Sequence, residues 1–373
     1  MKRIVILGGL GFIGLELCRR LVGQGHEVVA IDNLSPQIHG EMPATVVPEG
    51  TRAVRLDVRE LAERPDLFEG TNAVFHLAAE TGTGQSMYRI AHYVSVNGFG
   101  TAALLEAIAK CNKRPAQIVV ASSRSVYGEG AYVSPKAPDR LLQPAPRTRA
   151  QLDRGQWEPL DSDGVPLQAV ATPETLAFAP GSVYAATKAS QELLLMSASA
   201  ALGFKSTVFR FQNVYGEGQS LRNPYTGIIS IFFNRARQGM EIPLYEDGLE
   251  SRDFVHVHDI VNALTRSVGA DLPPGAVMNL GAGRPTSVTE LAHELLAAAE
   301  LTVPVRVTGQ FRVGDIRHCF ADLTQAHSLL GYTPEVSLSQ GLRRFCAWAQ
   351  AQPVHEDRLA AATEELRRKG LAN

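Results

Sequence analysis

This chain of 373 residues has few cysteines, almost no net charge and no N-terminal signal segment. The four cysteines, Cys18, Cys111, Cys319 and Cys346, form no Cys-x-x-Cys pair, so we expect no metal site. The formal net charge of -2 excludes a strong field toward nucleic acid or an anionic membrane, so local arginines must bind any phosphate. Without a signal segment, a reducing cytoplasm is the expected location.

Short apolar runs alternate with helical stretches through the first half of the chain. Hydrophobic residues make up 45% of the sequence, enough for two ordinary domains or one large α/β domain with an appendage. The runs at 4–7, 28–31, 53–56, 73–76 and 117–120 are short and rich in β-branched residues. This alternation predicts a Rossmann-type, doubly wound parallel sheet whose strand tips form the walls of a ligand site.

A glycine-rich turn follows the first of these strands. Gly8, Gly9, Gly11 and Gly14 lie in Gly-Gly-Leu-Gly-Phe-Ile-Gly and open a helical stretch. Glycines permit a tight strand-to-helix turn, and the free amides at the helix start attract a pyrophosphate. Asp32 follows the second strand, where its carboxylate would accept from both ribose hydroxyls and repel a 2′-phosphate. The sequence therefore predicts a dinucleotide site that prefers NAD to NADP.

A tyrosine and a lysine stand four residues apart in Tyr184-Ala-Ala-Thr-Lys188. On a helix they share one face, so we expect the ammonium to lie beside the phenol. A phenol has a reference pKa of about 10, and a fixed positive charge nearby favours its phenolate. The pair is therefore a candidate proton-transfer group. His76 stands at the end of another strand. We expect it to lie at the edge of the core and to hydrogen-bond the backbone, and we do not expect it to act as a ligand.

The regular alternation fails between residues 129 and 180, a segment rich in proline that contains several arginines and Trp157. Long connections of this kind are often lids or disordered segments. We weigh two interpretations equally, a lid or partner surface and a solvated insertion with one aromatic anchor. No Cys-x-x-Cys pair follows Trp157, because Asp161, Ser162 and Asp163 stand there, so packing alone is expected to hold the segment.

Beyond a further strand at 206–210 the periodicity changes, and short strands alternate with helices to about residue 350. We therefore expect an NAD-binding domain at 1–210, which includes the insertion, and a smaller α/β lobe that binds substrate at 211–350. The charged, alanine-rich segment at 351–373 is expected to form a surface tail with an amphipathic helix that stops near Gly370.

Several motifs together resemble the extended short-chain dehydrogenase/reductases of the NAD-dependent nucleotide-sugar epimerase/dehydratase family. The resemblance runs from residue 2 to about residue 350 and rests on the glycine turn, Tyr184-x-x-x-Lys188 and the motifs at 57–58, 76–79, 122–128, 213–216, 251–259 and 279–281. Within that family, the stretches at 78–87 and 219–227 most resemble the dTDP-L-rhamnose 4-epimerases.

The resemblance implies a role for each reacting residue. Ser123 falls on the family's catalytic Ser/Thr and would hydrogen-bond the reacting sugar hydroxyl. Tyr184 would remove that proton while the carbon below gives hydride to NAD, and Lys188 would bind the nicotinamide ribose and keep Tyr184 ionised. A transient 4-keto sugar would then receive hydride on its opposite face, which inverts carbon 4.

The resemblance and the strand tips also imply two sets of binding residues. Cofactor contacts are expected from Gly8, Gly11, Phe12, Ile13, Gly14, Asp32, Asn33, Asp57, Val58, Leu77, Ala78, Ala79, Asn97, Ser122, Tyr184, Lys188 and Phe211. Substrate contacts are expected from Glu80, Thr81, Gln85, Ser123, Asn213, Arg252, Arg312 and Arg317, with Arg252 and Arg312 as the diphosphate clamp. His256 and His258 are expected to be structural.

Three alternatives remain beside a dTDP-L-rhamnose 4-epimerase. A UDP-hexose 4-epimerase is open, because the sequence fixes neither nucleobase nor sugar. A 4,6-dehydratase is disfavoured, because Arg124 and Ser125 replace the Asp-Glu pair that those enzymes use for elimination. A noncatalytic NAD-binding scaffold is disfavoured because Ser123, Tyr184 and Lys188 are all present. Apolar positions around the helices that follow Met87 and Val183 predict a homodimer. The resemblance implies that these two helices pair across a twofold axis into a four-helix bundle.

Overall fold

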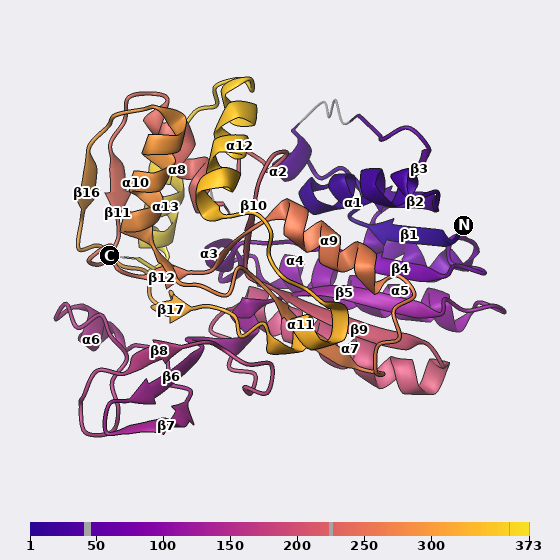
Figure 1. Cartoon of the computed structure of the whole chain (residues 1–373), viewed down its shortest axis with the longest axis horizontal. Coiled ribbons are helices and arrows are strands. Elements are labelled where there is room, and N and C mark those ends of the chain that lie inside the picture. Colours follow the sequence, from indigo (N-terminus) through magenta and orange to yellow (C-terminus); the bar gives the residue numbers. More distant parts are fainter. Residues whose placement is uncertain (41–45, 224–226, 358, 373) are drawn as a thin grey trace.

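The computed structural model describes residues 1–40, 46–223, 227–357 and 359–372, and it is built around one parallel sheet (Figure 1). The order of the seven strands is β14-β9-β5-β4-β1-β2-β3, and every pairing is parallel. The strands are β1 (Arg3–Leu7), β2 (Glu27–Asp32), β3 (Thr51–Arg55), β4 (Ala73–His76), β5 (Gln117–Ser123), β9 (Lys205–Phe211) and β14 (Ala276–Leu280). The predicted doubly wound α/β fold is confirmed.

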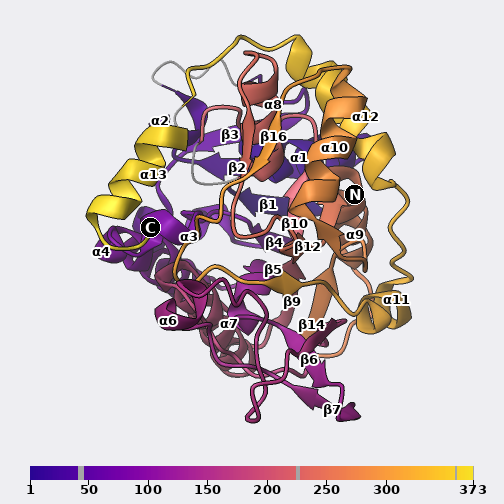
Figure 2. The same ribbon diagram turned by 90° about the vertical axis from the view of Figure 1, so that its left-hand side faces the viewer.

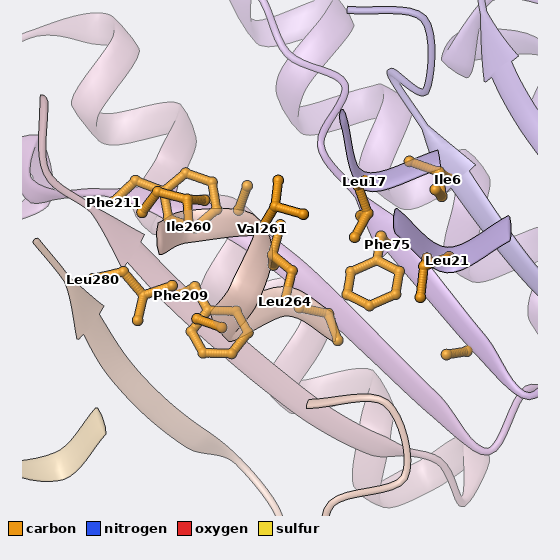
Figure 3. Close-up of a cluster of buried hydrophobic side chains, with 14 of the residues drawn as sticks. Ile6, Leu17, Leu21, Phe75, Phe209, Phe211, Ile260, Val261, Leu264 and Leu280 are labelled. Atoms are coloured by element: carbon orange, nitrogen blue, oxygen red, sulfur yellow. The ribbon is translucent and has the colours of Figure 1, made fainter. Parts of the chain in front are cut away.

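Helices cover both faces of the sheet, which is why its central strands are apolar on both sides. One face carries α1 (Phe12–Gly23), α9 (Val257–Ser267) and α11 (Thr324–Leu330). The other carries α5 (Gly100–Ala109), α7 (Val183–Leu202) and the 3-10 segment η1 (Val58–Glu63). Figure 3 shows the first core, where Leu17 and Leu21 of α1 and Leu264 of α9 lie near Phe75 and Phe209 of the sheet.

The central sheet does not stop at residue 210, where the sequence predicted a domain boundary. Strand β14 pairs with β9 through five positions from Ala276 to Leu280, and α9 packs on α1. Both elements lie in the segment expected to form mainly the substrate lobe. The chain therefore returns to the first domain after leaving it, and the exact division into two domains remains a prediction.

The smaller lobe combines three helices with short strand pairs. Its elements are α8 (Ile228–Ala236), α10 (Val288–Ala299), α12 (Leu338–Gln350), and strands β10 (Asn213–Tyr215), β11 (Ile242–Leu244), β12 (Ser251–Arg252), β13 (Phe254–His256), β15 (Thr286–Ser287), β16 (Val305–Val307) and β17 (His318–Cys319). The three helices share a separate core in which Phe233 meets Phe345 edge to face. The smaller lobe therefore has a hydrophobic core distinct from the two cores that flank the central sheet.

The insertion at 129–180 has its own structure, a three-stranded antiparallel sheet and a short helix (Figure 1). These are β6 (Ala131–Ser134), β7 (Ala137–Leu142), β8 (Gln168–Val170) and α6 (Arg149–Leu152). Buried ion pairs attach it to the smaller lobe, because Arg147 bonds Glu246 at 2.8 Å and Glu158 bonds Arg317 at 2.8 Å. The expectation that packing alone holds this segment was wrong. The alternation of apolar residues does not reveal pairs between charged groups far apart in sequence.

The short elements near the main cavity are α2 (Pro36–His39), η2 (Pro65–Leu67), α3 (Thr83–Ser86), α4 (Ile90–Tyr93), the π-helical η3 (Val94–Phe99) and the 3-10 turn η4 (Arg124–Tyr127). Helix α13 (Leu359–Arg368) ends the chain and lies near α4 in Figure 2. Leu366 is buried where a side chain on Gly84 would meet it, and Lys369 lies over the Tyr88 ring. The predicted tail helix is thus present and packs one face on the first domain. Within the described part of the chain, no helix is long and apolar enough to cross a membrane.

Candidate active site

A cavity of about 1030 Å³ opens at the carboxyl ends of the parallel strands, between the sheet and the smaller lobe. Most of the predicted cofactor residues line it: Gly8, Gly11, Phe12, Ile13, Gly14, Asp32, Asn33, Val58, Leu77, Ala78, Ala79, Ser122, Tyr184, Lys188 and Phe211. Glu80, Thr81, Ser123 and Asn213 of the predicted substrate set line the same cavity. Its volume reaches the upper end of the usual range for ligand sites, as two large ligands would require.

The glycine turn fits a pyrophosphate for a steric reason. A Cβ on Gly8 would lie 2.8 Å from the Ala78 nitrogen, and one on Gly14 would lie 2.2 Å from the Gly8 oxygen. Gly8 also has a φ of +74°, which other residues rarely adopt. Helix α1 starts at Phe12 after Gly11, whose lack of a side chain leaves the first amides uncapped. These free amides face the cavity and suit an anion.

Asp32 ends β2 beside this turn, with its carboxylate fixed by the backbone. Its oxygens accept from the amides of Leu10 at 3.1 Å and Leu34 at 2.9 Å. Asn33 follows and donates to Asp57 at 3.0 Å. The carboxylate of Asp57 also binds Arg59 through both oxygens, which holds its pKa well below the usual range. Asp57 is not among the residues that line the cavity, so in this structure it supports Asn33 instead.

Tyr184 lies in the first turn of α7, next to the tip of β5. Burial raises the pKa of Tyr184, while a hydrogen bond with Ser123 and the charge of Arg124 lower it. The Ser123 hydroxyl accepts from both the amide and the hydroxyl of Ser125, at 3.2 and 3.0 Å. Its own proton is therefore available for Tyr184 or for a ligand oxygen. The two residues form a short relay that opens into the cavity.

Lys188 is on the same face of α7, as the spacing predicted, and its ammonium is buried. It donates to the Ala121 carbonyl at 2.8 Å. Burial lowers the pKa of Lys188 to about 7, and the charge of Glu192 opposes this. Glu192 is itself buried, paired with Arg210 at 2.9 Å, and it accepts from the Ser122 hydroxyl. In this arrangement the cation that lowers the pKa of Tyr184 is Arg124, which the sequence analysis did not assign to that role.

Asn97, which lies in the π-helical segment η3, holds the loop after β4 in place through hydrogen bonds to Glu80. Its side chain accepts from the amide of Glu80 at 2.8 Å and donates to the Glu80 carbonyl and to Thr187. Asn97 is fully buried and is not among the residues that line the cavity, so it orients the loop rather than facing a ligand directly. Gln85 likewise does not line the cavity, and its side chain hydrogen-bonds Gln37 and Tyr93.

The two arginines predicted to clamp the diphosphate, Arg252 and Arg312, do not line the cavity, and neither does Arg317. Arg252 donates to the carbonyls of Ser251 and Arg317, and Arg312 lies over the Tyr245 ring. Arg317 is almost completely buried, and its guanidinium binds Glu158, Glu246 and Asp247. All its N–H groups are engaged in this way, so the structure provides no free donor for the substrate role expected of Arg317.

Among the described residues, the arginines that do line the cavity are Arg19, Arg124 and Arg222. Arg222 extends toward the loop after β2, since a Cβ on Gly40 would lie 2.6 Å from its Nη1. None of these three was predicted to bind a ligand. Arg222 lies in the stretch 219–227 that the sequence singled out as a whole, and Arg124 adjoins Ser123. Proximity to a recognised motif was therefore the available signal. Residues 224–226 of that stretch lie outside the described residues.

Two further motif residues, Asp253 and His256, hold neighbouring segments of the backbone in place. Asp253 is buried and accepts from the amides of Ala282, Gly283 and Ala321, while burial raises its pKa to about 6. The His256 ring accepts from the amide of His258 and caps α9, in line with a structural role.

His76 is buried, and its Nε2 lies 2.9 Å from the Thr101 hydroxyl and 3.2 Å from Gln191. Side chains are therefore the partners of Nε2, while Nδ1 is buried and has no hydrogen-bond partner among the described residues. The expectation of backbone partners was wrong. Burial lowers the pKa of His76 to about 3, so the ring is neutral at physiological pH.

A family model for the NAD-dependent epimerase/dehydratase family matches residues 4–150 and 162–281. The chain belongs to this family. Its matched part covers the sheet, the glycine turn and the Tyr184/Lys188 helix. A cofactor of the family's type fits the steric and charge features of the turn, of Asp32 and of the uncapped start of α1. The predicted NAD-dependent enzyme class is thus confirmed.

Relatives and solved structures of several activities resemble this family member along most of its length. It is 38% identical over 350 residues to a dTDP-L-rhamnose 4-epimerase of Burkholderia thailandensis, covering 93% of this chain and 94% of the relative. It is 29% identical to a dTDP-glucose 4,6-dehydratase of Streptomyces griseus, covering 92% and 93%. The crystal structure of a Thermotoga maritima UDP-glucose 4-epimerase with UDP-glucose has a TM-score of 0.76 and 27% identity, covering 93% and 98%.

Proposed function

We propose that this enzyme is a nucleotide-sugar 4-epimerase whose substrate is dTDP-L-rhamnose or its carbon-4 epimer. The observation that carries the proposal is the 38% identity to a dTDP-L-rhamnose 4-epimerase along almost the whole of both chains. The geometry supports it, because Glu80, Thr81, Gly82 and Thr83 line one cavity together with residues 219–223. Those are the two stretches that resemble rhamnose epimerases in sequence.

The protein's own groups supply proton transfer at carbon 4. The chemistry that NAD brings when bound, with the glycine turn and Asp32 holding it, is reversible acceptance of a hydride. Ser123 hydrogen-bonds the sugar hydroxyl, and the Tyr184 phenolate takes its proton as the carbonyl forms. After the 4-keto sugar turns over, Tyr184 returns the proton to the oxygen of the inverted centre. Lys188 holds the nicotinamide ribose, and the charge of Arg124 favours the phenolate.

Arg124 and Ser125 argue against a 4,6-dehydratase, although one such enzyme is 29% identical. Elimination needs a base at carbon 5 and an acid at the carbon-6 oxygen. An arginine that donates to Asn213, and a serine that donates to Ser123, supply neither. A UDP-hexose 4-epimerase remains the second candidate because of the structural similarity to the Thermotoga maritima UDP-glucose 4-epimerase with UDP-glucose.

A panel of nucleotide sugars tests the substrate. We expect the purified protein to interconvert dTDP-L-rhamnose and its 4-epimer, with lower catalytic efficiency on dTDP-glucose, UDP-glucose and UDP-galactose. An apolar contact with the 6-methyl group gives a preference of only about 1–3 kcal/mol, so weak hexose activity is compatible with the proposal. Products are resolved by chromatography and NMR. A UDP-hexose with higher kcat/KM than dTDP-L-rhamnose, measured side by side, would overturn the assignment.

We also propose that the enzyme is a cytoplasmic homodimer. The described cysteines are all free and buried, which fits a reducing compartment. Large apolar side chains are exposed on the two helical segments expected to pair: Ile90, Val94 and Phe99 on the first, and Leu193 on α7. Leu193 is 53% exposed and Phe99 is 56% exposed, which is unusual for such residues unless a partner covers them.

Leu193→Asp is expected to convert the dimer to a monomer, because it places a charge at the centre of an apolar interface. Sedimentation equilibrium at micromolar concentration measures the change. Leu249→Asp is the matched control, since Leu249 is equally exposed but lies on the smaller lobe, and it should leave the mass unchanged. A wild-type protein that sediments as a monomer would refute the dimer outright.

A further inference from the structure

Arg124 is a half-buried arginine that adjoins the proton-transfer residues and lines the cavity. It starts the 3-10 turn η4 directly after Ser123, which ends β5. Its Nε donates to the Asn213 side chain at 2.7 Å, and the Cys319 thiol is a further neighbour. Its Nη1 is buried and has no hydrogen-bond partner. A buried N–H group without a hydrogen-bond acceptor is unfavourable. We therefore expect a bound ligand to supply the acceptor for Nη1.

No carboxylate within the described ranges lies at ion-pair distance from Arg124. Burial and the charge of Arg252 lower the pKa of Arg124, and the charges of Cys319 and Asp315 oppose this. Arg147 and Arg317 are more deeply buried than Arg124, but each of them binds at least two carboxylates directly. Arg124 therefore differs from the structural arginines of this protein. Its one strong partner is a neutral amide that fixes the guanidinium in place and leaves Nη1 free.

The surroundings of Arg124 suit a hydroxyl better than a phosphate. Ser123, Ser125 and Asp315 line the cavity with it, and the charge of Asp315 acts on Arg124. A sugar hydroxyl is both donor and acceptor, so it can use an arginine and these oxygens together, whereas a phosphate would face the Asp315 carboxylate. The charge of Arg124 also reaches Tyr184, which places the guanidinium near the carbon on which Tyr184 acts. These features point to the hexose ring rather than to the diphosphate.

We propose that Arg124 is a substrate-binding residue whose free Nη1 donates a hydrogen bond to a ring hydroxyl of the hexose, next to the hydroxyl that Tyr184 deprotonates. This inference deepens the proposed function and rests on it in one respect, namely that the ligand is a nucleotide sugar. Asn213 orients the guanidinium through Nε, and the sugar completes its set of acceptors. Arg124 thereby positions the sugar ring so that its reacting hydroxyl faces Ser123 and Tyr184.

Arg124→Met tests the contact, with dTDP and dTDP-L-rhamnose as the two probes in calorimetric titrations of the NAD-loaded enzyme. We expect the variant to bind dTDP-L-rhamnose about ten- to hundredfold more weakly, the usual loss for a hydrogen bond from a charged donor, and to bind dTDP with unchanged affinity. Arg124→Lys should recover part of the loss because it keeps one charged donor. Arg140→Met, on the exposed strand β7, is the matched control and should match the wild type with both probes.

The pH dependence separates a substrate contact from a purely structural role. Removing a cation near Tyr184 raises the pKa of its phenol, so the acidic limb of the kcat profile should move to higher pH in Arg124→Met and return toward the wild type in Arg124→Lys. Equal weakening toward dTDP and dTDP-L-rhamnose would overturn the proposal by locating the contact on the diphosphate. Unchanged affinity for both would overturn it as well.

A folding defect in Arg124→Met does not block the test. The wild type can be titrated with dTDP-L-rhamnose analogues that lack the 2- or the 3-hydroxyl, and one of them should bind at least tenfold more weakly while Arg124→Lys is less sensitive to the same deletion. Equal affinity for all three sugars would overturn the contact. The proposed epimerase activity fails separately, when the wild type binds dTDP-L-rhamnose but forms no epimer.

Discussion

Tyr184→Phe is expected to lower kcat by a factor of about 10² to 10⁴, the usual contribution of a positioned acid–base group. Only the phenolic oxygen is lost, and that oxygen is the one that hydrogen-bonds Ser123 and opens into the cavity. The ring remains to pack at the start of α7. NAD content, measured after denaturation of the purified variant, should equal that of the wild type, and the melting temperature should be close to it.

Tyr132→Phe is the matched control for Tyr184→Phe. The Tyr132 hydroxyl is also buried, but it lies in the insertion, where it bonds the backbone of His318. Losing it should cost about 1 kcal/mol of stability and leave kcat within about threefold of the wild type. Tyr184→Phe activity within tenfold of the parent would exclude Tyr184 as the base, whatever the result for Tyr132.

Gly14→Ala should abolish retention of NAD and weaken its binding at least about a hundredfold. The added methyl group would lie 2.2 Å from the Gly8 oxygen and 2.7 Å from the Gly9 Cα, so the turn must move. Because these neighbours are backbone atoms, no side-chain rotation can relieve the clash. The movement displaces the amides that face the cavity, and overpacking of this kind also costs about 1–3 kcal/mol of stability.

Gly23→Ala, at the other end of the same helix, is the control for Gly14→Ala. A Cβ on Gly23 would meet nothing within 4 Å, so the same exchange should leave NAD binding unchanged. Alanine favours the helix by up to about 1 kcal/mol over glycine, so stability should stay the same or rise slightly. Fluorescence titration with NAD measures both variants. Normal affinity in Gly14→Ala would contradict the steric account of the turn.

The parts of the active site that depend on short spacings could be predicted from the sequence. Gly8 to Gly14 form one turn, and Tyr184 and Lys188 share one face of one helix, so neighbouring residues alone determine each geometry. Partners far apart in the chain could not be predicted in this way. The pair between Arg147 and Glu246 joins segments 99 positions apart, and nothing in the local pattern of either residue identifies the other.

Arginines show the same limit within the site. Arg252, Arg312 and Arg317 were chosen by their place in motifs, but a long flexible side chain can reach several partners, and packing decides among them. Arg317 ends in a cluster of carboxylates, whereas Arg124 and Arg222 reach the cavity. Glu192 was similarly missed, although it stands four residues after Lys188 on the same helix. Its burial is what makes its charge matter for Lys188.

By itself, the sequence determined the α/β class, the cofactor turn and the proton-transfer pair, because hydrophobic periodicity, glycine conformation and helical spacing act over a few residues. Tertiary structure alone decided that β14 forms one edge of the central sheet and that ion pairs attach the insertion to the smaller lobe. It also decided that Arg124 lies beside Tyr184 with an N–H group that has no acceptor. Those outcomes depend on burial, which removes water and forces each polar group to find a partner wherever the fold has placed one.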